Sequence, residues 1–386
     1  MSTWKSIKLI DLCDVEYGTR VVRKRDAGTI FPVYGGGGAT FSMDVYNREN
    51  RIVIARFAMS EKCTRFVKGK FFLNDSGLTI SAKDKKLIDE QFLNYQMLSL
   101  NDTIYSLARG TAQKNLNVDE FKNLSLSFPN STQEQKEIVG ILDQAFESIE
   151  KAKANIEKNI ENAKELFQSK LNQTFSQKNE DWEQVPLGNL GKITSSKRIY
   201  KKEYVNSGIP YYRSKEIKEL AHGKSISLEL FIKKTRYEDI KRDFGIPKVG
   251  DILITAIGAT IGEIYVIEND NPFYFKDGNV LWLKDFNSIN PDYLKLCLKY
   301  FLNNILSITR GSAYPALTIE KLKKYMVYVP TNDVQEIIVE TLDIMDNHVQ
   351  SLLSSYEEEL KNLEELKKSI LQKAFSGELT NKNKAA

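Results

Sequence analysis

With 386 residues the chain is long enough for two or three domains, and its 41% hydrophobic and 27% charged residues are typical of a soluble globular protein. No run approaches the ~18 apolar residues that a membrane span needs, and the first ten residues lack the apolar core of a secretory signal, so we expect a cytoplasmic protein. Three widely separated cysteines argue against a disulfide framework or a zinc site, and we expect them to be buried thiols.

The first 130 residues have the signals of a mixed α+β domain. Arg51 to Phe57 and Arg65 to Leu73 are short runs rich in apolar residues, which predicts strands. Asp89 to Leu107 follows as one predicted helix. We therefore expect a first domain over residues 1–130.

Residues 131–180 follow with the spacing of a coiled coil. Apolar residues alternate at intervals of four and three, which is the pattern of a seam between paired helices. The pattern recurs 200 residues later, in residues 331–379, and its defect recurs too: positions 159 and 359 are polar, and Ile160 and Leu360 stand one place later. The predicted seam comprises positions 138, 142, 145, 149, 152, 156, 163 and 166 with their counterparts 200 residues on, and its main pairing residues are Ile138, Leu142, Ile149, Ile156, Ile338, Leu342, Val349 and Tyr356.

Residues 181–330 form a second domain that resembles the first. Asp251 to Ile257 and Gly262 to Ile267 are predicted strands, and Asn290, followed by a proline and an acid, caps a predicted helix over Tyr293 to Ile308. Trp182 matches Trp4 at an offset of 178 residues, whereas matches beyond residue 50 have an offset of 201, so an insertion of 23 residues lies between residues 182 and 250. The predicted order along the chain is therefore domain, helix, domain, helix. We predict that residues 380–386 form a disordered tail.

The duplication bears on how the two long helices pack. A helix of about 34 residues is roughly 50 Å long and cannot bury its own seam, so we predict that the two helices pair; the alternative is that each packs only on its own domain. Two similar halves imply a pseudo-two-fold axis. We favour an antiparallel pair, because each helix can then leave its own domain and arrive at the other, although a parallel pair is also compatible with the sequence.

Catalytic patterns are absent from the sequence. No two prolines are adjacent, so the Asn-Pro-Pro-aromatic loop of amino-methyltransferases is missing. Gly223-Lys224-Ser225 lacks the first glycine of a P-loop, because Lys218 occupies its place. The only histidines, His222 and His348, have no metal-ligand partner at a suitable spacing. We expect a chain without catalytic residues, metal or cofactor.

Charge is unevenly distributed, which favours binding of a polyanion by the domains. The two domains together carry a net charge of +11 and the two helical segments −7. A basic cluster interleaved with aromatic and small residues stands at the same relative place in each domain, as a nucleic-acid face requires, although either cluster alone is equally consistent with a solvated loop. The candidate DNA-binding residues are Arg20, Arg23, Lys24, Arg25, Tyr34, Gly36 and Arg56 in the first domain, and Ser195, Lys197, Arg198, Tyr212, Arg213 and Lys215 in the second.

A further motif, Arg-Gly-(Thr/Ser)-Ala, occurs once in each domain after the predicted helix. It is consistent with a helix C-terminus, where arginine complements the dipole and glycine ends the helix, and equally with a DNA contact. The candidate residues are Arg109, Thr111, Gln113 and Lys114 in the first copy and Arg310, Ser312 and Tyr314 in the second.

At these residues the sequence resembles the specificity subunit of a type I restriction-modification enzyme. Arg109 to Asn117, the Phe128-Pro129 pair and Gln133 to Asp143 carry the resemblance, and second copies stand at Arg310 to Leu317, Val329-Pro330 and Gln335 to Asp343. The resemblance covers essentially the whole chain. The second copy has Tyr314-Pro315-Ala316 where the first has Gln113-Lys114-Asn115, so we do not expect the contacts of those three residues to be shared.

The resemblance implies two target recognition domains, each reading half of a split DNA sequence. It further implies that the long helices act as a spacer and bind two modification subunits. Those subunits would hold S-adenosylmethionine and methylate adenine, while motor-nuclease restriction subunits would use ATP and Mg2+. The alternatives are a stand-alone DNA-binding regulator with an internal coiled coil, and a structural coiled-coil protein that does not bind DNA.

Overall fold

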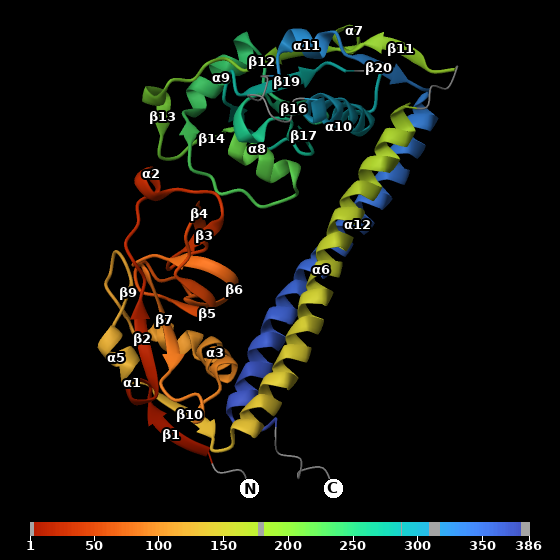
Figure 1. Ribbon diagram of the computed structural model, residues 1–386. Coiled ribbons are helices and arrows are strands. Elements are labelled where there is room, and N and C mark those ends of the chain that lie inside the picture. Colours follow the sequence, from red (N-terminus) through yellow and green to blue (C-terminus); the bar gives the residue numbers. More distant parts are fainter. Residues whose placement is uncertain (1–3, 177–180, 287, 309–316, 380–386) are drawn as a thin grey trace. The chain divides into compact units, whose positions relative to one another are not determined.

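The computed structural model describes residues 4–176, 181–286, 288–308 and 317–379 (Figure 1). These residues group into two compact units. Unit 1 holds residues 4–158 together with 355–379, and unit 2 lies within residues 159–354. Two long helices, α6 (Thr132–Ser176) and α12 (Asn332–Phe375), contribute one part to each unit.

Unit 1 is built on a six-stranded sheet with the strand order β2-β7-β5-β6-β3-β4. All neighbours are antiparallel except β3 and β6, which are parallel. Strand β5 lies inside the sheet, and its Ile52, Val53 and Ile54 are almost fully buried, as expected for an apolar run. The elements of this unit before α6 are β1 (Trp4–Lys8), α1 (Leu9–Leu12), β2 (Cys13–Tyr17), α2 (Arg23–Asp26), β3 (Phe31–Tyr34), β4 (Ala39–Met43), β5 (Arg48–Ala55), β6 (Thr64–Leu73), β7 (Gly77–Ala82), α3 (Glu90–Ser99), α4 (Asn101–Ser106), β8 (Ala108–Arg109), β9 (Asn115–Leu116), α5 (Val118–Lys122) and β10 (Ser125–Pro129).

The helix predicted over residues 89–107 is in fact two helices. Asp89 caps the first helix, because its carboxylate accepts from the backbone N–H groups of Gln91 and Phe92. The helix is interrupted at Leu100, where the Asn101 side chain binds the start of β6. Its amide oxygen accepts from the N–H groups of Cys63 at 3.0 Å and Thr64 at 3.1 Å, and this attachment accompanies the change of direction.

Unit 2 repeats the core of unit 1. Its sheet order β12-β19-β16-β17 corresponds to β2-β7-β5-β6. A second sheet, β13-β15-β14-β18, contains β14, which pairs antiparallel with β15 and parallel with β18, as β3 does with β4 and β6. The elements are β11 (Glu183–Pro186), α7 (Leu187–Leu190), β12 (Lys192–Ser195), the 3-10 helix η1 (Lys201–Glu203), β13 (Tyr204–Val205), β14 (Ile209–Tyr212), α8 (Ser214–Ala221), β15 (Phe231–Ile232), α9 (Lys234–Asp243), β16 (Ile252–Thr255), the 3-10 helix η2 (Gly258–Thr260), β17 (Ile264–Val266), β18 (Tyr274–Phe275), β19 (Val280–Lys284), α10 (Pro291–Ile308), α11 (Ile319–Lys323) and β20 (Met326–Val329).

The predicted insertion consists of two helices. Helix α8 lies between β14 and β15, and α9 lies between β15 and β16, whereas the corresponding connections of unit 1 contain no helix. The predicted start of α10 is confirmed, because the Asn290 side chain accepts from the N–H groups of Asp292 at 2.8 Å and Tyr293 at 3.3 Å. The internal repeat and the mixed α/β domains are therefore as predicted.

The two long helices pair in antiparallel fashion. In unit 1, Lys367 binds Glu150 at 3.1 Å and Lys153 lies 3.8 Å from Glu364, so rising numbers on α6 meet falling numbers on α12. In unit 2, Leu171 of α6 shares a core with Leu342 of α12. The alternative that each helix packs only on its own domain is wrong.

Most of the predicted seam residues are buried or half-buried. Ile138, Leu142, Ile149, Ile156, Leu342 and Val349 are buried, and Ile338 and Tyr356 are half-buried. Three predicted positions are wrong: Leu166, Leu352 and Leu366 are 55%, 44% and 47% exposed. Apolar residues that repeat strictly every 3.5 residues drift around a straight helix by about 20° per heptad. An additional interval of four residues compensates for this drift and returns the apolar residues to the buried face. Ile160, Ala163, Phe167 and Leu171 follow the corrected line in α6.

One buried glutamine joins each long helix to its domain. Gln135 is fully buried; its amide oxygen accepts from the Asp89 N–H at 2.8 Å, and its amide nitrogen donates to the carbonyls of Leu87 and Pro129 at 3.1 and 2.9 Å. In unit 2, Gln335 is 1% exposed; it accepts from the Asn290 N–H at 2.8 Å and donates to the Pro330 carbonyl at 2.9 Å. One amide thus binds the helix cap and the end of the last strand, and fixes where the long helix begins.

Replacing Gln135 by methionine tests this bond network. The change keeps the side-chain length but leaves the Asp89 N–H and two carbonyls without a partner, and each such buried group costs about 1–3 kcal/mol. We expect the free energy of unfolding to fall by at least ~2 kcal/mol in urea denaturation and the Asp89 amide to exchange faster with deuterium. Gln144→Met, at an exposed position of the same helix, is the control and should change neither value.

Candidate nucleic-acid interface

Some of the predicted residues of unit 1 gather where several strands end. We call this surface the loop edge; it comprises residues 18–19, 34–38, 56–62, 74–77 and 110–114. The turn before β7 joins two of these segments: Ser76 accepts from the Arg56 N–H with its carbonyl at 2.8 Å and from the Gly36 N–H with its hydroxyl at 3.2 Å. The structure therefore brings Gly36 and Arg56 together.

The four consecutive glycines at positions 35–38 have two different roles. A Cβ at Gly36 would lie 2.8 Å from the carbonyl oxygen of Phe57, so this position needs glycine for packing. Gly37, by contrast, is exposed and has no atom within 4 Å of its Cβ position. Of the four glycines, Gly37 and Gly38 are therefore the ones that leave room for a ligand to approach the backbone. Tyr34, just before the run, is half-buried with its ring 5.6 Å from that of Phe71.

Arg56 is held by aromatic rings. Its guanidinium lies 4.8 Å from the ring centre of Tyr17 and 4.6 Å from that of Phe57. Among the described residues no carboxylate lies within ion-pair distance of it. Arg56 therefore keeps its positive charge uncompensated at the loop edge.

The cluster on and before α2 is exposed. Arg20, Arg23 and Lys24 have no ion-pair partner in the part of the chain that the structure describes. Arg25 binds Asp26 at 2.8 Å, and this hydrogen bond lowers the pKa of the Asp26 carboxyl. Three free cations therefore stand close together on and before α2, which leads to the bridge between Gly28 and Ser42 of strand β4.

The Arg-Gly-Thr-Ala motif is not a helix end. Helix α4 stops at Ser106, and Arg109 pairs with Asn115 in the hairpin of β8 and β9, so Gly110, with φ of 111°, begins the hairpin loop. The helix-cap alternative is therefore wrong for this copy, because the chain has already turned into a strand. Thr111 and Gln113 are exposed in this loop.

The hairpin is attached to the segment that follows β5. The Met59 N–H donates to the Lys114 carbonyl at 2.8 Å, and the Ala58 N–H donates to the Asn115 side chain at 3.2 Å. The Lys114 ammonium donates to the Tyr105 hydroxyl at 3.1 Å. Arg109 is bound by both carboxylate oxygens of Glu120, at 3.0 and 2.9 Å. The loop residues therefore belong to the same surface as Arg56, but the charge of Arg109 is compensated.

The predicted cluster of unit 2 is largely paired with carboxylates. Arg213 binds Glu216 at 2.6 Å and Glu229 at 2.7 Å, and Lys215 binds Glu229 at 2.8 Å. Hydrogen bonds from Lys215 and Arg213 lower the pKa of Glu229 to about 2. Arg198 likewise binds Asp277 at 2.8 Å. The two basic clusters, similar in sequence, therefore present different charge to a ligand.

Other predicted residues of unit 2 have structural contacts. Ser195 donates to the Val280 carbonyl and accepts from the Gly278 N–H, each at 3.2 Å. Tyr212 stacks on Phe273 with ring centres 4.5 Å apart. The Lys197 ammonium lies 4.4 Å from the ring centre of Phe244 and stays exposed. The remaining candidates, Arg310, Ser312 and Tyr314, lie outside the described residues.

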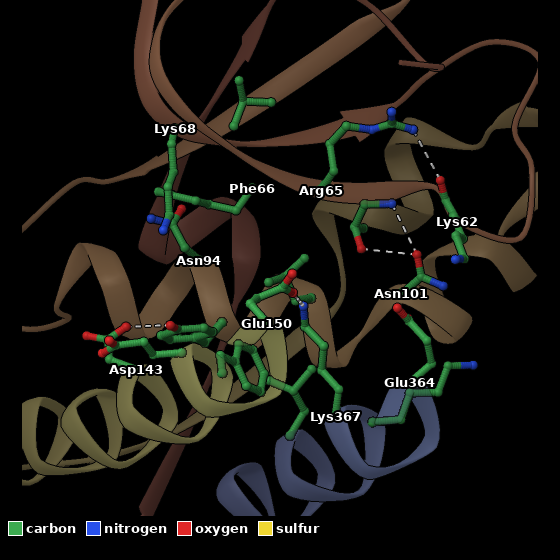
Figure 2. Close-up of a pocket in the computed structure, with 18 of the residues that line it drawn as sticks. Lys62, Arg65, Phe66, Lys68, Asn94, Asn101, Asp143, Glu150, Glu364 and Lys367 are labelled. Carbon is green, nitrogen blue, oxygen red and sulfur yellow. Dashed lines mark hydrogen bonds and ion pairs between the residues drawn. The ribbon is translucent and has the colours of Figure 1, made fainter. Parts of the chain in front are cut away.

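Unit 1 also contains an open cleft of about 1240 Å³ that no sequence pattern indicated (Figure 2). Strand β6 and the segment before it contribute Lys62, Arg65 and Lys68 to one wall. The long helices contribute four carboxylates to the other, and three of these bind lysines: Glu147 with Lys151 at 2.7 Å, Glu150 with Lys367 at 3.1 Å and Glu364 with Lys153 at 3.8 Å. These carboxylates offset part of the positive charge of the cleft, to which the helix wall adds Lys151, Lys367 and Lys368. The four carboxylates are those of Asp143, Glu147, Glu150 and Glu364.

Arg65 connects the cleft with the loop edge. Its guanidinium donates to the Gly36 carbonyl at 3.2 Å and to the Lys62 carbonyl at 3.4 Å. Burial lowers the pKa of Arg65. Sequence reasoning missed this arginine because it lies within a predicted strand, where a charged residue has no distinguishing signal.

The described residues contain no group of three or more His, Cys, Asp or Glu side chains that could hold a metal ion, and none of their helices is long and apolar enough to cross a membrane. All three cysteines are buried free thiols, as predicted. Burial raises the pKa of Cys63 to about 11 and that of Cys13 to about 12, so both stay protonated near neutral pH.

Comparison with known proteins agrees with this architecture. A Haemophilus influenzae protein assigned as a type I restriction enzyme specificity subunit is 24% identical over 337 residues, which are 85% of this chain and 83% of that protein. The Escherichia coli type I restriction enzyme EcoBI specificity subunit is 27% identical over 221 residues, which are 52% of this chain and 42% of that protein.

Solved structures share the fold. A chain from a structure concerning complex assembly and conformational transition of the type I R-M system superposes with a TM-score of 0.73 at 18% identity, covering 97% of this chain and 98% of that one. The HsdS subunit from Thermoanaerobacter tengcongensis gives a TM-score of 0.54 at 18% identity, with 97% of each chain covered.

The family profile extends over both domains. The type I restriction modification DNA specificity domain matches residues 1–162 and again residues 179–362, so each repeat corresponds to one copy. The chain belongs to the type I restriction-modification DNA specificity family, and its role is that of a specificity subunit.

Proposed function

We propose that each domain reads one half of a bipartite DNA target while the paired helices set the spacing and bind two modification subunits. The observation that carries the proposal is the repeat itself: the same four-strand order occurs in both units, but the residues around it differ in charge and in inserted helices. Duplicated scaffolds with different surfaces suit a target whose two halves differ. A stand-alone regulator is not favoured, because the relatives that match most of this chain are named as specificity subunits.

Helix length is compatible with this spacing. Half-sites on one face of duplex DNA lie about 34 Å apart per helical turn. Helix α6 has 45 residues and is therefore roughly 65 Å long. Such a helix pair is long enough to separate two reading surfaces by one turn or more.

The loop edge of unit 1 and the basic cluster on and before α2 fit a duplex chemically. Free arginines and lysines bind phosphates and release counterions, which gives affinity with a strong dependence on salt. Exposed polar side chains such as Thr111 and Gln113 can reach base edges, and one good bidentate contact contributes about 1–3 kcal/mol of discrimination. In unit 2, carboxylates compete with DNA for Arg213 and Lys215, so we assign most of the phosphate attraction to unit 1.

The chain itself carries no catalytic group in this proposal. S-adenosylmethionine, ATP and Mg2+ belong to the modification and motor-nuclease restriction subunits. Adenine methylation requires the base to leave the helical stack, and the two domains hold the flanking duplex while the partner acts.

Removing two cations from α2 tests the phosphate contacts. For Arg23→Ala with Lys24→Ala, we expect weaker DNA binding and a salt slope, log K against log salt, that is shallower by about 2. The control is Lys85→Ala with Lys86→Ala, which removes the same charge from exposed positions away from the loop edge. Equal slopes for both variants would contradict the assignment.

The charge competition in unit 2 predicts a gain of affinity. Glu229→Gln frees Lys215 and removes one of the two carboxylates bound to Arg213, so we expect DNA to bind several-fold more tightly at low salt, measured by fluorescence anisotropy. Asp239→Asn removes the same charge from an exposed residue that binds Arg242, and should have a smaller effect. No difference between the two variants would exclude a role for this cluster.

Exchanging residues 1–130 for those of a relative tests the modular proposal. In a host that also supplies the modification subunits, sequencing of methylated adenines should show one half of the target changed and the other half retained. A change in both halves, or in neither, contradicts independent reading.

A further inference from the structure

Arg56 stands at a fixed point of the loop edge, one residue after β5. Its backbone N–H donates to the Ser76 carbonyl at 2.8 Å, in the turn before β7. Its carbonyl accepts from the Leu116 N–H at 2.9 Å, in the hairpin strand β9. Because both backbone groups are paired with neighbouring segments, the point at which the side chain leaves the backbone is set by the fold.

Unit 2 has the same backbone arrangement with a different side chain. The Ala256 N–H donates to the Asn279 carbonyl at 2.8 Å, and the Ala256 carbonyl accepts from the Leu317 N–H at 3.0 Å. Ala256 also follows directly after β16, as Arg56 follows β5. Ala256 is 1% exposed and its side chain has no polar group. The two units therefore share the scaffold at this position, but only unit 1 places a cation on it.

The guanidinium of Arg56 is oriented without being neutralised. Its central carbon lies over the rings of Tyr17 and Phe57, and these contacts restrict a side chain that would otherwise be mobile. Within the described residues it donates one long hydrogen bond, of 3.5 Å, to the Asp75 carbonyl. A guanidinium has five N–H donors in a planar fork. Most of these donors are therefore available to a ligand.

The other cations of unit 1 named above lack this combination. Arg109 is bound by both carboxylate oxygens of Glu120, and Arg65 donates to two backbone carbonyls. Arg23 and Lys24 are uncompensated, but they stand on a helix of four residues and are exposed. Mobile cations suit phosphates, which accept contacts in many geometries, whereas an oriented fork suits the edge of a base.

We propose that Arg56 reads a guanine in the half-site of unit 1, with two of its N–H groups donating to O6 and N7 of that base in the major groove. Guanine presents two neighbouring acceptors there, whereas each of the other three bases presents a donor or a methyl group. Unit 2 has alanine at the equivalent position and does not make this contact. The inference rests on the proposed reading of two half-sites, and it adds one residue, one base and a reason why the halves differ.

Duplexes that contain 7-deazaguanine test the contact, because this base pairs normally but lacks the N7 acceptor. The probe is the target mapped from methylated adenines, with one guanine replaced at a time, and the protein is the full chain with its modification subunits. In the half that changes when residues 1–130 are exchanged, we expect one replacement to weaken binding at least about fivefold. A half without a guanine on either strand, or without a sensitive guanine, overturns the proposal.

Arg56→Ala assigns the contact to this residue. The equivalent backbone already carries alanine at Ala256, and urea denaturation checks that the variant is folded. We expect the variant to bind the unmodified duplex about 5- to 150-fold less tightly and to be insensitive to 7-deazaguanine. Sequencing of methylated adenines in a host should then show any base at that guanine position, with every other position retained.

Arg23→Ala is the matched control, because it removes one positive charge from an exposed side chain of the same unit. It should weaken binding to every duplex equally and keep the sensitivity to 7-deazaguanine. If Arg56→Ala behaves in the same way, Arg56 contacts a phosphate, and the proposal is overturned while the reading of two half-sites stands. A target in which neither half follows residues 1–130 overturns both.

Discussion

The position of each long helix depends on one buried glutamine amide. An amide has one acceptor and two donor hydrogens, and Gln135 uses both kinds of group on backbone atoms of the α3 cap region and of β10. Backbone groups at helix and strand ends have no partner within their own element, and leaving them buried and unpaired is costly. The glutamine satisfies them and, in doing so, ties three elements together at one point. Gln335 repeats the arrangement in unit 2.

The two halves of the chain share their buried features and differ in their surface features. The sheet order, the glutamine contacts and the antiparallel seam are common to both halves, because each depends on buried groups that tolerate few substitutions. Loops, inserted helices and outer helix faces differ, because solvent accepts many side chains. Two different reading surfaces can therefore stand on one scaffold without a change in the core.

Much of the fold could be predicted because its signals are local or periodic. The coiled-coil spacing, the Asn290 cap and the matches between the two halves all appear in the sequence. The β8–β9 hairpin could not, since its strands are two residues each and leave no periodic pattern. Nor could the helix break at Leu100, because it accompanies the contact of Asn101 with a strand that begins 37 residues earlier.

The candidate site was predictable only in part, for a physical reason. Basic residues can be counted in a sequence, but their partners cannot: Glu229 lies 16 residues from Arg213 and neutralises it only after folding. The same holds for Arg56, which contacts the adjacent ring of Phe57 and also that of Tyr17, a distant residue in the sequence at the end of strand β2. Composition therefore located the basic clusters, whereas the structure shows which cations remain available.

The end of α12 has a consequence for biosynthesis. Phe375 packs on Phe92 with ring centres 5.1 Å apart, and Leu371 and Ala374 belong to the same core. When the ribosome has finished the first domain, these covering residues are still hundreds of codons away. The surface around Phe92 therefore stays bare while the remainder of the nascent chain is made, and a prematurely terminated product would carry it permanently. Such fragments would expose apolar surface and be prone to aggregation. The core of the first domain is therefore complete only when the last helix, α12, has been synthesised.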